Sequence, residues 1–297
     1  MQLPAPLDLL GRKREVENVI TAPFLPLPNA KRVTILEDTD LAFPELWLNV
    51  FVFGPEAGPS FNKLFARCKC FKAETPGDAD LVVFTGSGHD VDPQLYGELP
   101  HKSTEVNAAI DKANLTLYGY CVKHGIPMFG VCGGAQILHV AEGGKLYQDV
   151  DGHNGPHTMW DVVGKQLIQR VSSVHHQLCI PNEAGGMEVI GKSNAARERW
   201  LNDKESRVGS QMDVEAFYYR KHCIIGVQGH PEYAGYNAYT VWCMKQLDHY
   251  LNENPDLSYT SSEGLGSRLR IKEELRAEER LVSIPSEEMI IVEAKGN

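Results

Sequence analysis

The sequence lacks several features that mark whole classes of protein. No stretch of its 297 residues approaches the roughly 18 consecutive apolar residues that a membrane span requires. The first ten residues, MQLPAPLDLL, lack the basic start and the continuous apolar segment of a secretory leader. Basic residues are in deficit, with 29 Lys and Arg against 39 Asp and Glu, and the net charge of -10 repels nucleic acid phosphates. We therefore expect a cytoplasmic protein that binds neither a membrane nor a nucleic acid.

The cysteines lack the pattern of a disulfide framework or of a zinc site. Their number, seven, is odd and their spacing is scattered, which is typical of a reducing compartment. Cys68 and Cys70 have no second cysteine pair at ligand spacing, so we interpret them as structural thiols. His153 and His157 are four residues apart, but Pro156 and nearby glycines argue against a helix that aims both at one ion. The sequence therefore predicts no metal and no cofactor, and it places these two histidines in a loop near a pocket.

Short apolar runs rich in β-formers alternate with helical segments along most of the chain. The runs are RVTIL at 32–36, DLVVF at 80–84, IPMFGV at 126–131 and CIIGVQ at 223–228. The helical candidates are Ser60 to Cys70, Glu105 to His124, Ala135 to Glu142 and Asn237 to Asn252. This alternation predicts an α/β fold with a doubly wound, mostly parallel sheet flanked by helices, of the flavodoxin-like type. Turn-rich segments at 145–220 predict a small antiparallel excursion before the chain returns to the sheet.

Composition divides the chain into three regions. Residues 1–30 are rich in proline and lack a lasting period, which predicts an irregular arm. Residues 31–252 carry the α/β pattern and are interpreted as one domain. Residues 253–297 contain a linker and then SRLRIKEELRAEERLV, where charges of both signs stand at helical spacing. A solvated helix and a partner-docking segment are both open for this tail.

The strongest chemical signal is the segment GVCGGAQ at 130–136. An apolar strand ends at Val131, Cys132 follows, and two glycines open a helical segment. Glycines permit the strained turn on which a nucleophile is presented, and they let a substrate approach closely. The N-terminus of a helix also favours the thiolate form of Cys132. A buried structural cysteine before a glycine turn is the alternative, so other residues must decide between the two.

The tripeptide His230-Pro231-Glu232 supplies the deciding residues. Proline disfavours a helical conformation at His230, so the side chains of His230 and Glu232 point the same way and can form a hydrogen bond. An imidazole oriented by a carboxylate is the base that a thiol nucleophile needs. Both loops follow the carboxyl ends of predicted parallel strands, where doubly wound sheets place their sites. We therefore predict that Cys132, His230 and Glu232 form a catalytic triad.

These motifs resemble those of the class I glutamine amidotransferases and of their relatives, the gamma-glutamyl hydrolases. The family elbow Gly-x-Cys-x-Gly-x-Gln stands at 130–136, and its base motif His-Pro-Glu stands at 230–232. Three more stretches are similar to the branch that hydrolyses gamma-glutamyl-gamma-aminobutyrate: FTGSGHDVDPQLYGE at 84–98, SVHHQ at 173–177 and DVEA at 213–216. The resemblance covers roughly residues 31–252 and implies hydrolysis of a gamma-glutamyl amide through a cysteine thioester.

The resemblance also implies roles for individual residues. The backbone N–H of Gly133 and one from the loop at 86–88, at Ser87 or Gly88, would form the oxyanion hole. The residues implied in substrate binding are Gln136, which would hold the glutamyl group, and His175, His176 and Gln177 at the rim of the pocket. Asp90 and Asp92 are instead interpreted as turn-forming residues. The loop at 86–88 has neither a Walker lysine nor a dinucleotide fingerprint, so no nucleotide is implied.

The sequence leaves two alternatives for the amine that the reaction releases. With glutamine as substrate the protein would be a glutaminase that supplies ammonia to a separate synthetase. With a larger amine it would be a stand-alone gamma-glutamyl conjugate hydrolase. The DVDP and HHQ stretches favour the conjugate hydrolase, whereas the charged tail and Gly133, which stands where that branch usually has arginine, favour the glutaminase. We expect the glutaminase. A third alternative is an idle relative that serves as a binding subunit, against which the intact Cys132, His230 and Glu232 argue.

Overall fold

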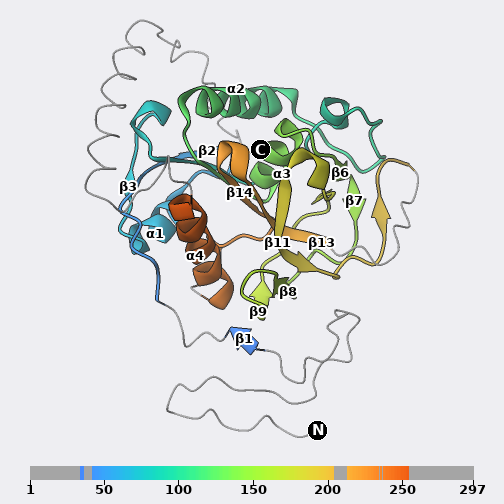
Figure 1. The fold of residues 1–297 in the computed structure, drawn as a ribbon. Coiled ribbons are helices and arrows are strands. Elements are labelled where there is room, and N and C mark those ends of the chain that lie inside the picture. The colour runs from blue at the N-terminus through green and yellow to red at the C-terminus, as the bar shows by residue number, and fades with distance from the viewer. Residues whose placement is uncertain (1–33, 37–41, 204–212, 234, 236, 254–297) are drawn as a thin grey trace, which may run out of the picture.

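A mixed β-sheet forms the centre of the structure (Figure 1). The structure is a computed structural model that describes residues 34–36, 42–203, 213–233, 235 and 237–253. Within these ranges, ten strands form one sheet in the order β1-β9-β8-β11-β13-β14-β5-β4-β2-β3. Because many neighbouring strands are distant in sequence, crossover connections join them, as in a doubly wound fold. The predicted fold class is confirmed.

One half of the sheet is parallel and contains three strands that are buried at every residue. Its members in spatial order are β14 (Ile224–Val227), β5 (Met128–Val131), β4 (Leu81–Phe84), β2 (Asn49–Phe53) and β3 (Phe71–Lys72). Every residue of β14, β5 and β4 is buried, as expected for strands covered by helices on both faces. Val227 pairs with Val131, and Phe84 pairs with Gly130. The carboxyl ends of these three parallel strands therefore lie side by side, at the same end of the strands.

The other half is antiparallel and is larger than the small excursion predicted for 145–220. The strands β8 (His157–Asp161), β9 (Gln166–Val171), β11 (Met187–Ser193) and β13 (Asp213–Tyr219) join the main sheet itself. Shorter strands form two separate pairs: β6 (Leu146–Tyr147) with β10 (Leu178–Cys179), and β7 (Asp149–Val150) with β12 (Arg199–Trp200). Strand β13 pairs with β14. Without this pairing β14 would be an edge strand with unpaired N–H and C=O groups, which explains why the excursion extends the sheet.

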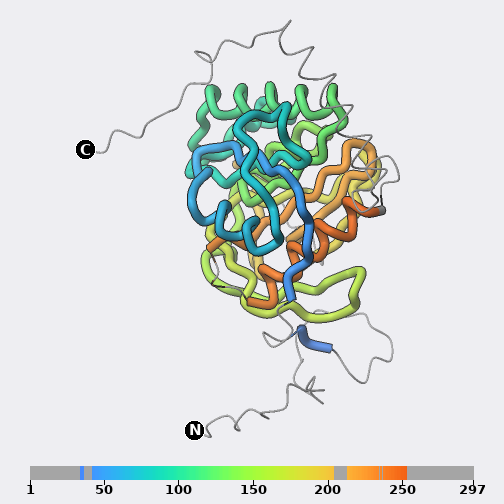
Figure 2. The backbone as a smooth tube through the Cα atoms, turned by 90° about the vertical axis from the view of Figure 1, so that its left-hand side faces the viewer, coloured from blue at the N-terminus to red at the C-terminus, as the bar shows by residue number. Residues whose placement is uncertain are grey.

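Helices cover both faces of the sheet. They are α1 (Pro59–Arg67), α2 (Ala108–His124), α3 (Gly133–Ala141) and α4 (Ala238–Glu253). In both ribbon and tube views α2 lies at the top and α4 lies lower, with the sheet between them (Figures 1 and 2). Helix α2 begins and ends at residues that are typical of helix ends. For α2, the Asn107 side chain accepts hydrogen bonds from the N–H groups of Ala109 and Ile110, and Gly125 ends the helix with φ 63°.

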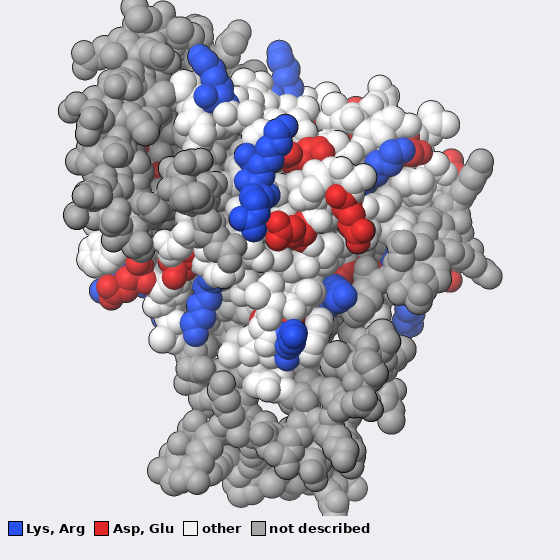
Figure 3. All heavy atoms as spheres, viewed as in Figure 1, with Lys and Arg blue, Asp and Glu red and all other residues white. Residues whose placement is uncertain are grey.

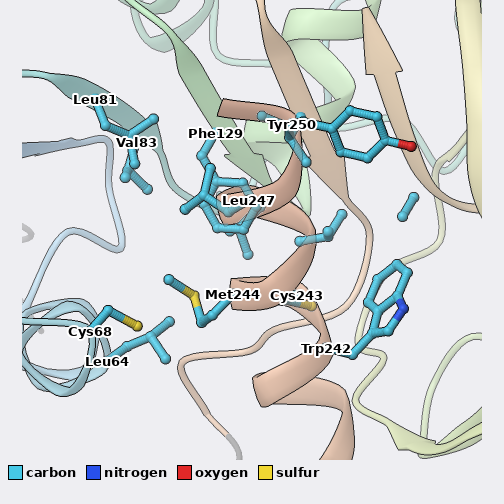
Figure 4. Packing of buried hydrophobic residues seen from close by; sticks show 14 of the residues in the cluster. Leu64, Cys68, Leu81, Val83, Phe129, Trp242, Cys243, Met244, Leu247 and Tyr250 are labelled. Carbon is cyan, nitrogen blue, oxygen red and sulfur yellow. The ribbon is translucent and has the colours of Figure 1, made fainter. Parts of the chain in front are cut away.

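Apolar side chains divide between the two faces with the period of a β-strand. Val83 belongs to the cluster under α1 and α4, whereas Val82 and Phe84 belong to the cluster under α2 and α3. Figure 4 shows the first cluster, in which Met244 and Leu247 of α4 face the sheet. Each large side chain buried in this way contributes about 1.5–3 kcal/mol. The two clusters together fix both helical layers to the sheet.

One predicted core strand takes a different place. The run at 32–36 was expected in the buried part of the sheet, but the structure describes a strand only at Thr34–Leu36, which is β1, and this strand pairs with β9 at the sheet edge. Its residues are exposed or half-buried. The place next to β4 in the parallel half belongs to β2, which the sequence analysis does not predict. Charged residues flank the run at 32–36 on both sides, and such flanks suit an edge strand better than a core strand.

The remaining predictions concern the chain ends, membrane spans, the cysteines and the surface charge. The arm at 1–30 and residues 254–297 of the tail lie outside the described residues. No helix in the described ranges is long and apolar enough to cross a membrane. All seven cysteines lie within those ranges as free thiols. On the face drawn in Figure 3, acidic and basic side chains intermix rather than gather into a patch of one sign.

Candidate active site

Cys132 occupies the turn between β5 and α3. Its backbone has φ 52° and ψ -114°, a conformation that costs a residue other than glycine on the order of 1–3 kcal/mol. The turn is held on both sides, because Cys132 N–H donates to the Val227 carbonyl at 2.8 Å and Gln136 N–H donates to the Cys132 carbonyl at 3.0 Å. The predicted strand-turn-helix arrangement is confirmed. The thiol lies at the N-terminus of α3, where unpaired N–H groups favour an anion.

The glycines near Cys132 let backbone segments meet. A Cβ atom at Gly130 would lie 2.7 Å from Ala135 Cα, and one at Gly134 would collide with the carbonyl oxygen of Phe84. No side chain fits at either position, because the first turn of α3 packs directly against β5 and the end of β4. This packing explains the glycine spacing around the cysteine.

His230 and Glu232 form the predicted hydrogen bond. Nδ1 of His230 donates to Glu232 Oε1 at 2.8 Å, and both side chains are buried. Ser172 fixes the backbone at this point, since it accepts from His230 N–H at 2.9 Å and donates its hydroxyl to the His230 carbonyl at 2.9 Å. The imidazole is therefore held by its ring and by its backbone.

The charge state of His230 depends on its two neighbours. Burial by itself lowers the pKa of His230, but the Cys132 side chain and Glu232 outweigh burial and raise this pKa to about 10. Nε2 of His230 is buried and has no hydrogen bond of ordinary geometry among the described residues, but the Cys132 side chain is close enough to raise the pKa of the ring. This rise in the pKa of His230 favours the imidazolium form of the ring. Such a cation favours the thiolate form of a neighbouring cysteine.

Two residues that the sequence analysis missed cover the imidazole. The Tyr233 ring stacks on His230 with ring centroids 4.3 Å apart and an interplanar angle of 1°. Its hydroxyl donates to Glu56 Oε2 at 3.1 Å, and that oxygen lies 4.0 Å from His230 Nδ1. Tyr233 directly follows the His-Pro-Glu motif, which was an available signal. Glu56 is far away in sequence, and its only signal is its place after β2, another parallel strand.

The loop at 86–88 meets α3 where the resemblance implies an oxyanion hole. A Cβ atom at Gly133 would lie 3.1 Å from Ser87 N, so the two predicted donors belong to adjacent segments. A small cavity is lined by Ser87, Gly133 and Ile137. A Cβ atom at Gly88, by contrast, would meet nothing within 4 Å. Of the two residues, Ser87 is therefore the one whose backbone nitrogen lies next to Gly133.

Gln136, His175 and Gln177 form one buried group. Gln136 Nε2 donates to the Gln177 carbonyl at 2.8 Å, and His175 Nδ1 donates to the same carbonyl at 2.9 Å. The Gln177 side chain accepts from Val91 N–H at 3.2 Å. Burial, followed by the neighbouring His153, lowers the pKa of His175 to about 3, so its ring is neutral. The Nε2 atoms of His175 and Gln177 are buried and have no partner within the described part of the chain.

His176 has a different environment. Its Nε2 lies 2.9 Å from Asp90 and its Nδ1 lies 3.2 Å from Asp149. The hydrogen bond with Asp90 raises the pKa of His176 against the opposing effect of burial. Because both ring nitrogens are occupied, a contact with substrate would have to replace one of these pairs.

The residues interpreted as structural have structural roles here. Asp92 accepts from Gln94 N–H at 2.9 Å, and Asp90 accepts from Glu105 N–H at 2.9 Å, so both acids hold the 84–98 loop. Burial raises the pKa of the Cys68 thiol to about 12 and that of Cys70 to about 11. Neutral, mostly buried thiols of this kind are inert.

The chain is similar to one protein-family model and to several known proteins. Residues 75–232, more than half of the chain, match the family model of peptidase C26. The chain is 30% identical over 171 residues to a candidate glutamine amidotransferase of Schizosaccharomyces pombe, covering 53% of this chain and 63% of that protein. It is also 30% identical over 129 residues to the carbamoyl phosphate synthase small chain of Maridesulfovibrio salexigens, covering 43% of this chain and 29% of that one. A solved glutamine amidotransferase of Thermotoga maritima aligns with 79% of this chain and 97% of its own, at 16% identity and a TM-score of 0.43.

The chain belongs to the peptidase C26 family, which is of the class I glutamine amidotransferase-like type. The matched stretch includes the loop at 84–98, Cys132, His230 and Glu232. The chain spans less than two thirds of the length of both curated relatives.

Proposed function

We propose that the protein hydrolyses the side-chain amide of glutamine through a thioester on Cys132, releasing glutamate and ammonia. The observation that carries this proposal is the strained turn that presents Cys132 to an imidazole whose other nitrogen is bonded to Glu232. Membership of the peptidase C26 family supports the same class of chemistry.

The first half of the proposed reaction forms the thioester. The Cys132 sulfur attacks the side-chain carbonyl carbon, and an electron pair moves onto the carbonyl oxygen. Backbone N–H groups of Gly133 and Ser87 stabilise this oxyanion, each by about 3–4 kcal/mol. His230 then gives its Nε2 proton to the amide nitrogen, the C–N bond breaks and ammonia leaves.

The second half releases glutamate. Neutral His230 takes a proton from water, and the water oxygen attacks the thioester carbon. The C–S bond breaks, glutamate leaves, and the sulfur returns as a thiolate beside the regenerated imidazolium. Glu232 keeps the ring oriented through both halves and stabilises its charged form, as the third member of a triad does.

We propose that the glutamyl group binds against His175 and Gln177. The neutral His175 ring donates through Nδ1, so its free Nε2 is an acceptor suited to the α-ammonium of glutamine. The free Nε2 of Gln177 is a donor suited to the α-carboxylate. Gln136 orients this pair by donating to the Gln177 carbonyl. Two buried unpaired polar groups of opposite kind thus match the two charged groups of an amino acid.

Released ammonia requires an acceptor, which we propose to be a separate synthetase. The likeness to a carbamoyl phosphate synthase small chain supports this partner, because that name denotes one chain of a larger synthase.

A second candidate is hydrolysis of a gamma-glutamyl conjugate with a larger amine. The match to peptidase C26 and the loop at 84–98 favour it. The chemistry at Cys132 would be the same, and only the leaving amine would differ.

Both candidates are tested by offering glutamine and a series of gamma-glutamyl amines to the purified protein. Cys132→Ser serves as the blank. The proposal predicts ammonia release from glutamine with kcat/KM higher than for any conjugate. Preference for a conjugate would select the second candidate. If no substrate releases glutamate, even after a cell extract that contains synthetases is added, both candidate functions are contradicted.

A further inference from the structure

A second group of ionisable side chains lies in the antiparallel half of the sheet. His153 precedes β8, His157 begins that strand, and Glu215 lies on β13. One ligand atom from each of the three lies within 4.8 Å of the other two. The side chains of His153 and Glu215 are fully buried, and that of His157 is 11% exposed. We call these three residues the histidine–glutamate cluster.

Hydrogen bonds determine which nitrogen of His153 faces Glu215. Asp213 lies 3.2 Å from His153 Nε2, so Nε2–H donates to this carboxylate. The other nitrogen, Nδ1, lies 3.6 Å from Glu215 Oε1. Ser173 Oγ is 3.4 Å from Nδ1, but its proton is donated to the His153 carbonyl at 2.6 Å. The lone pair of Nδ1 therefore faces a carboxylate oxygen, and two acceptors that face each other attract a cation.

Glu215 has an unpaired oxygen. Its Oε1 accepts from His157 Nε2 at 2.7 Å and from Ser193 Oγ at 2.6 Å, but its Oε2 is buried and has no partner among the described residues. Leaving a buried charged acceptor unsatisfied is costly. The nearby guanidinium of Arg199 does not supply the missing charge, because it binds the other carboxylate, Asp213, at 2.9 Å.

We propose that a divalent transition-metal ion, of the class of Zn²⁺, binds between His153, His157 and Glu215. Two imidazoles and one carboxylate are a common zinc ligand set. Ligand atoms of a tetrahedral zinc ion lie about 3.4 Å apart, given metal–ligand bonds of about 2.1 Å. The 3.6 Å between His153 and Glu215 fits this spacing. The 2.7 Å between His157 and Glu215 is shorter because a proton lies between them. When the ion binds at Nε2, that proton moves to Nδ1 of His157, so the ring stays a neutral imidazole.

Asp213 provides the support that such a site requires. Histidine ligands usually donate their second N–H to a carboxylate, which fixes the tautomer and the ring orientation. Asp213 does this for His153, and it is itself held by Ala196 N–H at 2.8 Å and by Arg199. The bound ion ties the loop before β8 to β13. Because His175 stacks on His153 with ring centroids 4.7 Å apart, the ion also fixes the segment that carries Gln177.

His153 and His157 were expected from the sequence to bind no metal, because no helix would aim both at one ion. That expectation was correct about the absence of a helix, since His157 begins a strand and His153 lies before it. It could not include Glu215, which a sheet pairing distant in sequence brings to the two histidines.

The test loads the purified full-length protein with Zn²⁺, removes the excess by gel filtration and measures zinc per chain by mass spectrometry. We expect about one zinc per chain in the wild type. His157→Asn and Glu215→Gln should reduce this at least about tenfold, since each removes one ligand. His124→Asn, which changes a histidine on α2 outside the cluster, should keep the zinc.

Further variants separate the cluster from the candidate active site. Cys132→Ser and His230→Asn should both retain zinc, since neither residue is a proposed ligand. Thermal unfolding provides a second readout, because Zn²⁺ should raise the Tm of the wild type but not that of His157→Asn. If Glu215→Gln fails to fold, His157→Asn alone decides. A wild type that holds no zinc, zinc content unchanged in His157→Asn, or zinc lost in Cys132→Ser would overturn the proposal.

Discussion

The two halves of the sheet hold their buried polar groups in different ways. At the carboxyl ends of the parallel strands, Cys132 sits in strained backbone, and the unpaired atoms of His175, Gln177 and His230 belong to loops. In the antiparallel half, neither β8 nor β13 contains a residue with positive φ, and the unpaired oxygen of Glu215 lies within a regular strand. Strain alone does not separate the two halves, because Arg170 of β9 also has a positive φ, 58°. The difference is that the strained residue Cys132 lies beside the bonded pair His230 and Glu232.

The largest expected effect is a loss of activity that leaves the proposed zinc site in the antiparallel half unchanged. Cys132→Ser should lower glutamine turnover at least about a thousandfold, because the nucleophile is lost, while Tm and zinc content stay as in the wild type. Ammonia release, thermal unfolding and metal analysis of the same preparation check this. Retention of full activity would remove Cys132 from the mechanism.

The second prediction concerns the turn itself. Gly134→Ala places a Cβ against the Phe84 carbonyl and should lower the free energy of unfolding by about 2–3 kcal/mol. The matched control is Gly119→Ala on α2, where a Cβ meets nothing within 4 Å and should add up to about 1 kcal/mol. Urea unfolding measures both. Equal stability of the two variants would show that the turn is not closely packed.

The third prediction concerns the charge on His230. Glu232 helps to raise the pKa of His230 to about 10, so the imidazolium persists until the pH passes that value. Glu232→Gln should lower the pKa of His230 and move the alkaline limb of kcat/KM to lower pH, by about one pH unit.

Glu56→Gln is the control for this pair. Its oxygen lies 4.0 Å from Nδ1 without a hydrogen bond to it, so the alkaline limb should move less than in Glu232→Gln. An alkaline limb that is the same in the wild type and in Glu232→Gln would mean that Glu232 does not act through His230.

The smallest effect is expected at His139 of α3. Burial lowers the pKa of His139 to about 4, and its ring accepts from the Tyr219 hydroxyl at 2.9 Å. The unfolded chain binds this proton below about pH 6.5, whereas the folded chain resists it until about pH 4. The stability is therefore present above pH 6.5 and falls between these values, by at most about 1.4 kcal/mol per pH unit.

His139→Asn should show a shallower loss of unfolding free energy between pH 7 and pH 5, measured with urea. An unchanged slope would assign the acid sensitivity to other groups. His175, which is also neutral and buried, is present in both proteins and so cancels from the comparison.

The sequence predicts best what short stretches of chain determine. The turn at Cys132 and the His230–Glu232 bond depend on glycines and on a proline within a few residues, and both are present as expected. The strand β2 was missed because the run at 32–36 offered a similar apolar pattern closer to the predicted start of the domain. Glu56 and Glu215 were missed for another reason: each reaches its partners through sheet pairings that the spacing of residues along the chain does not reveal. The roles given to Ser87, Gln136 and Gln177 stay predictions.

The central claim is that one cysteine of seven is the nucleophile. Burial raises the pKa of each of the other six thiols, Cys68, Cys70, Cys121, Cys179, Cys223 and Cys243. A glutamine analogue with a chloromethyl ketone in place of the side-chain amide, followed by peptide mapping, measures the claim directly. We predict one label, on Cys132, formed in step with loss of activity and slowed by glutamine. Complete inactivation with the label on a different cysteine, or activity that persists after Cys132 is fully labelled, would contradict it.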